Sequence, residues 1–286
     1  MKAVVTGASG FVGRHLRDAL RDAGWRVATL DRSGPADHVG DLRTMPLRGI
    51  RADVVFHLAA FANPSASVDA AADVYASNAA ATARLARELP AGRLVFPSTC
   101  QVYAPADRPL DEGAPLGPRN PYAASKLCAE ALALAAKEDV VILRPFNHTG
   151  PGQSAAYVCP SIARQIARAE AGGPRRLEIK NGAPRVDFFD VRDMARAYLL
   201  AAERGVAGRR YNVGTGRPVS IETIARTLRG MSRVPLELRA GRGPASTLSG
   251  DASLFQRDTG WRPEIPLRRT LSDLLDDERR QVTVKD

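Results

Sequence analysis

Short apolar runs alternate with longer amphipathic stretches up to about residue 145 of this 286-residue chain. The apolar runs lie at 4–5, 27–30, 54–56, 94–96 and 140–143. Each has the length of a buried strand, and the stretches between them predict helices near 11–23, 67–89 and 119–137. Regular alternation of strand and helix predicts a parallel sheet with helices on both faces, joined by right-handed crossovers.

The pattern changes after residue 145. Loops rich in Gly and Pro separate short elements there, with helices expected near 156–171, 191–203, 220–230 and 266–279 and strands near 177–179 and 210–213. We therefore expect an α/β protein: a Rossmann-type doubly wound parallel sheet with a smaller α/β C-terminal lobe.

A glycine-rich loop follows the first apolar run and precedes the first expected helix. Its G-x-x-G-x-x-G spacing permits a tight turn and close approach of a pyrophosphate to a helix N-terminus. The residues expected to hold the ligand are Gly7, Ser9, Gly10, Phe11, Val12 and Gly13. This context predicts dinucleotide binding. Residues 1–150 would form the dinucleotide-binding domain and 151–286 mainly a substrate-binding lobe, with segments near 186–213 returning to the first domain.

Residues after the next strands bear on the choice of dinucleotide. Asp31 ends the second strand, and a carboxylate there favours the ribose hydroxyls of NAD(H). Arg32 could instead bind the 2′-phosphate of NADP(H), so NADP(H) remains an alternative cofactor. We expect Asp41 and Leu42 beside the adenine, with the alternative that Asp41 caps a helix at 42–49.

The segment 57–60 ends the strand at 54–56, where small residues let the backbone run beside the cofactor. Leu58, Ala59 and Ala60 are therefore expected in the cofactor site, whereas His57 is expected to be structural.

Charge and cysteine content limit the classes of protein to which this chain can belong. The net charge is +10, but the basic residues are spread along the chain without aromatic interleaving, which argues against nucleic-acid binding. Three scattered cysteines predict neither a disulfide framework nor a metal site, and favour a reduced, cytoplasmic setting. No apolar stretch approaches the roughly 18 residues of a membrane span, and Met1-Lys2 leads directly into the first strand, so we expect no signal peptide.

Tyr122 and Lys126 lie four residues apart, on one face of the helix expected at 119–137. A free phenol has a pKa of about 10. A neighbouring ammonium group is expected to lower that pKa toward the working range, and a nicotinamide ring acts in the same direction. With the dinucleotide loop, this pair predicts redox chemistry at a carbon that bears oxygen.

The chain resembles the extended short-chain dehydrogenase/reductases, which act on nucleotide-diphosphate sugars. The resemblance covers nearly the whole length and is carried by segments 6–13, 57–60, 98–103, 121–126, 144–151 and 187–193. The run 144–153 looks most like the subgroup of GDP-4-keto-6-deoxy-mannose reductases.

This resemblance implies a third catalytic residue, Thr99, which would orient Tyr122 and hydrogen-bond the reacting sugar oxygen; neighbouring Ser98 is the alternative. Related 4,6-dehydratases carry an acidic residue directly after that hydroxyl residue. This chain has Cys100 and Gln101 there, so elimination of water lacks its carboxylate.

The resemblance also implies positions for the substrate. Asn147 would contact the sugar or diphosphate, and Val158 would line the base pocket or pack in the core. Where many relatives have a phosphate-binding arginine, this chain has Val186, with Arg185 one residue earlier. Arg242 is the stronger candidate, because a guanidinium group can hold two phosphate oxygens. Ser98, Thr99, Cys100 and Gln101 are also expected at the substrate.

The function expected from these residues is NAD(P)H-dependent reduction of the C4 keto group of a nucleotide-diphosphate 4-keto-6-deoxyhexose. Thr99, Tyr122 and Lys126 would be catalytic. The alternatives are a 4-epimerase that uses bound NAD and the same residues, and a non-catalytic dinucleotide sensor. The resemblance implies a homodimer. The helices near 67–89 and 119–137 are alanine-rich, which would let two helix pairs approach closely in a four-helix interface; the alternative is that they are ordinary helices packed on the sheet.

Overall fold

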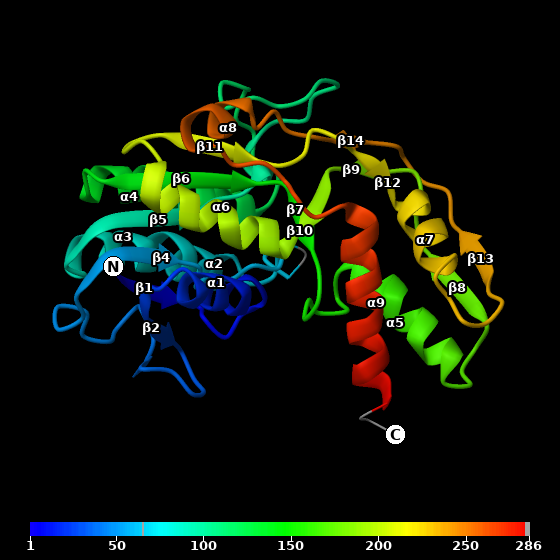
Figure 1. Cartoon of the computed structure of the whole chain (residues 1–286). Coiled ribbons are helices and arrows are strands. Elements are labelled where there is room, and N and C mark those ends of the chain that lie inside the picture. The colour runs from blue at the N-terminus through cyan, green and yellow to red at the C-terminus, as the bar shows by residue number, and fades with distance from the viewer. Residues whose placement is uncertain (65, 284–286) are drawn as a thin grey trace.

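The computed structural model describes residues 1–64 and 66–283 (Figure 1). Its centre is a seven-stranded sheet in the order β11-β6-β5-β4-β1-β2-β3, in which all neighbouring strands run parallel. The strands are β1 (Lys2–Thr6), β2 (Arg26–Asp31), β3 (His38–Val39), β4 (Ala52–His57), β5 (Ala91–Pro97), β6 (Val140–Pro145) and β11 (Arg210–Val213). The expected fold class is confirmed. Because the chain order reverses between β1 and β4, a ligand is expected at the carboxyl edge of these strands.

Helices cover both faces of this sheet. One face carries α1 (Phe11–Asp22) and α6 (Val191–Arg204). The other carries α2 (Ala71–Tyr75), a π-helical turn η1 (Ala76–Ala80), α3 (Ala81–Glu88) and α4 (Pro121–Ala136). A short 3₁₀ turn, η2 (Cys100–Val102), and α8 (Ser253–Thr259) complete the main part. Buried aliphatic residues on each side of the strands form two separate cores.

A smaller lobe lies beside the main sheet, to the right in Figure 1. Its core is formed by α5 (Val158–Glu170), α7 (Ile221–Arg229) and α9 (Leu267–Thr283). Its short strands are β7 (Asn147–Thr149) with β10 (Phe188–Asp190), β8 (Arg176–Ile179) with β13 (Glu237–Ala240), and β12 (Val219–Ser220) with β9 (Arg185–Val186) and β14 (Thr247–Leu248).

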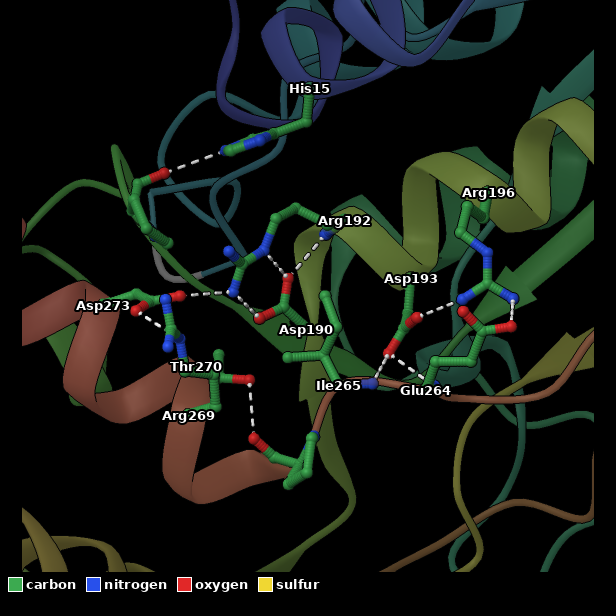
Figure 2. Close-up of polar contacts among 12 residues, drawn as sticks. His15, Asp190, Arg192, Asp193, Arg196, Glu264, Ile265, Arg269, Thr270 and Asp273 are labelled. Carbon is green, nitrogen blue, oxygen red and sulfur yellow. Dashed lines mark hydrogen bonds and ion pairs between the residues drawn. The ribbon is translucent and has the colours of Figure 1, made fainter. Parts of the chain in front are cut away.

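Ion pairs join the start of α6 to α9. The Asp190 side chain caps α6 by accepting from the backbone N–H of Arg192 at 2.7 Å. The Arg192 guanidinium donates to Asp190 and, at 2.8 Å, to Asp273 of α9 (Figure 2). The first turn of a helix in the main part is therefore tied to the C-terminal helix of the lobe.

Asp193 makes a second connection at the same place. Its buried carboxylate accepts from the backbone N–H groups of Glu264 and Ile265 at 3.1 and 2.9 Å, and from Arg196 at 2.7 Å (Figure 2). Its carbonyl accepts from the indole of Trp261, which is fully buried. The segment before α9 is thereby fixed against α6.

A third connection links α1 to the lobe. Arg14 donates to the carbonyl of Gly152 at 2.8 Å. The His15 ring donates to the carbonyl of Pro151 at 3.0 Å (Figure 2). The Gly152 N–H in turn donates to Asp277 of α9. Helix α1, which follows the glycine loop, therefore contacts the lobe through the turn that contains Pro151 and Gly152.

Some sequence expectations need correction. The alternative that Asp41 caps a helix at 42–49 is wrong: the structure describes this whole segment, and it forms turns. The Asp41 carboxylate accepts from the Arg43 N–H at 2.8 Å and closes one of them. The helix expected at 67–89 begins at Ala71 and is interrupted by η1. Among the described residues, no helix has both the length and the hydropathy of a membrane span.

Candidate active site

The start of α4 positions the central pair of side chains. Asn120 caps this helix by accepting from the Ala123 N–H at 2.8 Å, and Pro121 occupies the first helical position. Tyr122 therefore lies in the first turn, and Lys126 lies one turn further along the same face. Asn120 also donates to the Gln101 side chain at 3.0 Å, which ties the helix to the turn after β5.

Burial dominates the acidity of Tyr122. It raises the pKa of this phenol to about 12, and a hydrogen bond with the Thr99 side chain opposes the increase. Thr99 follows β5 and is buried, with its hydroxyl also accepting from the Gln101 N–H at 3.2 Å. The sequence predicted a lowered pKa, but in the protein alone the phenol stays protonated at neutral pH.

Lys126 is 3% exposed, and its Nζ lies 4.2 Å from the centre of the Phe96 ring. Burial lowers the pKa of this amine to about 7, while the charge of Glu130 opposes the decrease. The ammonium and neutral forms are therefore both accessible near neutral pH.

The glycine loop forms a tight cradle at the carboxyl end of β1. Gly7 has a φ of 68°, and a Cβ on it would lie 2.8 Å from the Ala59 nitrogen. A Cβ on Gly13 would lie 2.2 Å from the Gly7 carbonyl oxygen. The loop thus packs directly against the segment containing Leu58 and Ala59, and the start of α1 follows it. This cradle fits the pyrophosphate of a dinucleotide.

Asp31 lies at the end of β2 next to this loop. Its buried carboxylate accepts from the Ser9 N–H and the Ser9 hydroxyl, each at 3.1 Å. Arg32 is exposed beside it. Asp41 pairs with Arg43, whose hydrogen bonds lower the pKa of Asp41 to about 2. Leu42 is buried in the core on the α3 side.

His57 is held in a buried chain of hydrogen bonds. Thr6 accepts from the Ala59 N–H at 3.0 Å and donates to Nδ1 of His57 at 2.8 Å. Because the Thr82 hydroxyl donates to a helix carbonyl, it accepts from Nε2 of His57 at 2.9 Å. Burial, together with the charge of Lys126, lowers the pKa of His57 to about 3. A neutral, fully bonded imidazole is a structural group.

The carboxylate described near the Thr99 turn, that of Asp187, is already hydrogen-bonded to backbone groups. Cys100 is buried, and burial raises the pKa of its thiol to about 12, so it is no base. Asp187 lies close enough to affect that thiol. Its oxygens accept from the backbone N–H groups of Thr215 and Gly216. An acid–base pair for elimination is therefore not assembled here.

The expected substrate residues are dispersed. Asn147 is exposed on β7, and Val158 is the first residue of α5 and 37% exposed. Arg185 is exposed and donates to the Pro218 carbonyl at 2.9 Å. Arg242 is exposed in the loop after β13. No contact described in residues 1–64 and 66–283 joins either arginine to Tyr122.

Sequence reasoning missed two residues at this site. The Tyr157 hydroxyl donates to the Ala62 carbonyl at 3.1 Å, which links the start of α5 to the loop after β4. Glu130 lies one turn beyond Lys126 and is fully buried. Its spacing from Lys126 was a visible signal, whereas nothing in the sequence indicated the Tyr157 contact.

One buried polar atom at this edge lacks a partner. The Ser98 Oγ has no hydrogen bond with any residue that the structure describes, which fits a position that meets a ligand. Within the same described ranges, no cluster of His, Cys, Asp and Glu side chains is arranged to hold a metal ion.

Comparison with known proteins identifies a matching family and several similar enzymes. Residues 3–214 match the NAD dependent epimerase/dehydratase family. The chain is 36% identical to a GDP-6-deoxy-D-mannose reductase of Pseudomonas aeruginosa, over 96% of this chain and 95% of that protein. It is 32% identical to a UDP-glucose 4-epimerase of Azospirillum brasilense, over 92% of this chain and 87% of that protein.

Solved structures show the same likeness. The structure of RMD from Pseudomonas aeruginosa complexed with NADPH has a TM-score of 0.87 and 32% identity, covering 98% of this chain and 99% of that one. MoeE5 in complex with UDP-glucose and NAD has a TM-score of 0.86 and 30% identity, covering 99% of this chain and 100% of that one.

Proposed function

Because this chain belongs to the NAD dependent epimerase/dehydratase family, we propose that it reduces the C4 keto group of a nucleotide-diphosphate 4-keto-6-deoxyhexose. GDP-4-keto-6-deoxy-mannose is the favoured substrate, which the similarity to a GDP-6-deoxy-D-mannose reductase supports. The observation that carries the proposal is that Thr99, before η2, lies near Tyr122 on α4, with Lys126 one turn along and no carboxylate at position 100 or 101.

The cofactor of this reaction is NADPH or NADH. Similar proteins have been solved with NADPH and with NAD. The cradle at Gly7 and Gly13 would hold the pyrophosphate, and Asp31 and Arg32 would lie near the adenosine ribose. When bound, the cofactor supplies the hydride that attacks the C4 carbonyl carbon.

The protein's own residues handle the proton. The half-buried Tyr122 phenol is protonated at neutral pH, so it can donate its proton to the alkoxide that develops on the C4 oxygen. The Thr99 hydroxyl hydrogen-bonds the same oxygen and keeps the phenol oriented. The Lys126 ammonium stabilises the phenolate that remains, and burial of Lys126 makes this attraction stronger than in water.

The proposal is tested by the variant Tyr122→Phe, assayed through loss of NADPH absorbance with GDP-4-keto-6-deoxy-mannose. We expect turnover to fall by about a hundredfold or more, since a general acid typically contributes that much. NADPH binding, measured by fluorescence, should change little. Tyr75→Phe removes a hydroxyl from an exposed tyrosine on α2 and is the matched control. Full activity of the Tyr122 variant would remove the phenol from the reaction.

A 4-epimerase remains the second candidate, which the similarity to a UDP-glucose 4-epimerase supports. The two reactions differ in how they use the cofactor. An epimerase keeps NAD bound through purification and interconverts sugar nucleotides without added reductant. Stoichiometric consumption of NADPH with the keto sugar instead identifies the reductase.

We also propose that the protein is a cytoplasmic homodimer. Helix α4 is apolar around most of its circumference, and Cys128 and Leu132 are exposed on the side away from the sheet. Exposed Tyr75 of α2 adds to this surface. A second copy would cover it by a two-fold arrangement of two helix pairs. All three cysteines are free thiols, which supports a reducing compartment.

A further inference from the structure

A buried carboxylate occupies the helical turn directly after Lys126. Glu130 is on the same face of α4 as Lys126 and has no exposed surface. It is bound by two arginines: Arg144 of β6 donates from Nε at 2.9 Å and from Nη2 at 2.7 Å, and Arg210 of β11 donates at 3.2 Å. The carboxylate is therefore fixed, one helical turn from the amine, by groups from two strands.

Arg144 is in turn fixed by a third segment. Its Nη1 donates to the Tyr103 hydroxyl at 3.0 Å, and its guanidinium lies 4.9 Å from the centre of that ring. The Tyr103 hydroxyl donates to Asn212 of β11 at 2.8 Å. Glu130 thus cannot move away from Lys126 without breaking contacts to β6, β11 and the turn after β5.

We propose that Glu130 is a positioning residue for the reduction: its locked carboxylate, one helical turn from Lys126, favours the ammonium form of that amine over the neutral form beside Tyr122. The role of Glu130 in the reaction depends on the proposed function of the protein.

The other groups around Lys126, among the described residues, supply no negative charge that would stabilise its ammonium form. His57 of β4 is neutral, and the Phe96 ring of β5 carries no charge. Tyr122 on α4 is protonated, and Cys100 of η2 is a thiol. From η1 and α3, the buried polar side chains toward α4 are the uncharged Asn78 and Thr82. Arg144 of β6 is cationic and binds Glu130. Its positive charge disfavours the ammonium form of Lys126 rather than stabilising it.

The kinetic test is the pH profile of kcat/KM for keto-sugar reduction with Glu130→Gln. Without the negative charge the ammonium loses its proton more readily, so the alkaline limb should move to lower pH by about one unit. Glu130→Asp keeps the charge and should restore the limb. Glu278→Gln is the matched control: Glu278 is equally buried and pairs with Arg164 on α5, in the smaller lobe. It should leave the limb in place.

Glu130→Gln leaves Arg144 buried without its carboxylate, which weakens folding. The double variant Glu130→Gln with Arg144→Met removes both charges and avoids that cost. Its alkaline limb should lie between that of Glu130→Gln and that of the wild type, because loss of the Arg144 charge offsets part of the effect of losing Glu130. A limb at the wild-type pH in both the single and the double variant would overturn the proposal.

A second readout needs no substrate or cofactor. The pKa of Lys126 is about 7 in the fold and ordinarily 10.5, so between these values the unfolded chain binds more protons and the free energy of unfolding rises with pH. In Glu130→Gln this rise should begin at lower pH, and urea unfolding from pH 6 to 8 measures it. An unchanged slope overturns the role of Glu130, whereas failure to reduce any keto sugar overturns only the proposed function.

Discussion

Asp31 illustrates how one side chain bears on the choice of cofactor. Its carboxylate is held next to the glycine loop by Ser9 and lies near the expected ribose, while Arg32 is exposed beside it. The carboxylate favours a ribose with free hydroxyls and repels a 2′-phosphate, which Arg32 attracts. We therefore expect the two residues to have opposite effects on the preference for NADPH over NADH.

Replacing each of them should separate these effects. Asp31→Ser should change the ratio of kcat/KM for NADPH over NADH about tenfold or more in favour of NADPH, since a hydrogen bond to a charged group contributes about 1.5–3 kcal/mol. Arg32→Ala should change the ratio in the other direction. Ser9→Ala removes a neutral partner of Asp31 and should leave it nearly unchanged. Equal ratios in all four proteins would exclude Asp31 and Arg32 from cofactor choice.

Residue identity was easier to predict than residue acidity. The spacing of Tyr122 and Lys126 indicated a pair on one helix face, and the resemblance added Thr99, whose side chain lies close enough to oppose the rise in the pKa of Tyr122. The direction of the Tyr122 pKa was wrong because burial outweighs every neighbouring charge. Burial depends on strands far away in sequence, such as the one that brings Phe96 under Lys126.

At the scale of elements, the N-terminal cap of α4 connects stability with chemistry. Asn120 caps the helix and also holds Gln101 of the turn that carries Thr99. Asn120→Ala should reduce the free energy of unfolding by about 1 kcal/mol, measured by urea, and should also lower kcat by misplacing Tyr122.

Ser220→Ala is the matched control for this cap. Ser220 caps α7 in the smaller lobe by accepting from the Thr223 N–H at 3.0 Å. Its loss should cost a similar amount of stability and leave kcat unchanged. If both cap variants lower kcat equally, the position of α4 has no special effect on the reaction.

The longer helices and most strands of four or more residues were predicted, including β8 and β11, whereas the two-residue strands were not. The five strands with continuous apolar runs and the helices α1, α4 and α6 appear where the pattern placed them. Two-residue strands such as β3 and β12 are too short to carry a period, and they form because the chain passes beside a neighbouring strand. The pairing of β8 with β13 joins segments about sixty residues apart, which no local pattern encodes.

At the scale of the whole molecule, the proposed homodimer makes a direct prediction. Leu132→Glu places a charge on the exposed side of α4, so the protein should become monomeric in multi-angle light scattering, because burying an unpaired charge is costly. Val206→Glu changes an equally exposed aliphatic residue in the loop after α6 and should remain dimeric. A wild type that runs as a monomer would contradict the proposed interface.

Trp261 lies in the same core as Ala3, although almost the entire chain separates them. Its indole is bonded to α6, and its ring packs against Phe189 and Phe255. During synthesis on the ribosome, the strands near the N-terminus therefore wait for this late segment before their core can close. The core on the α1 and α6 side is therefore completed only when translation is nearly finished, whereas the core on the α3 and α4 side needs no residue beyond 142.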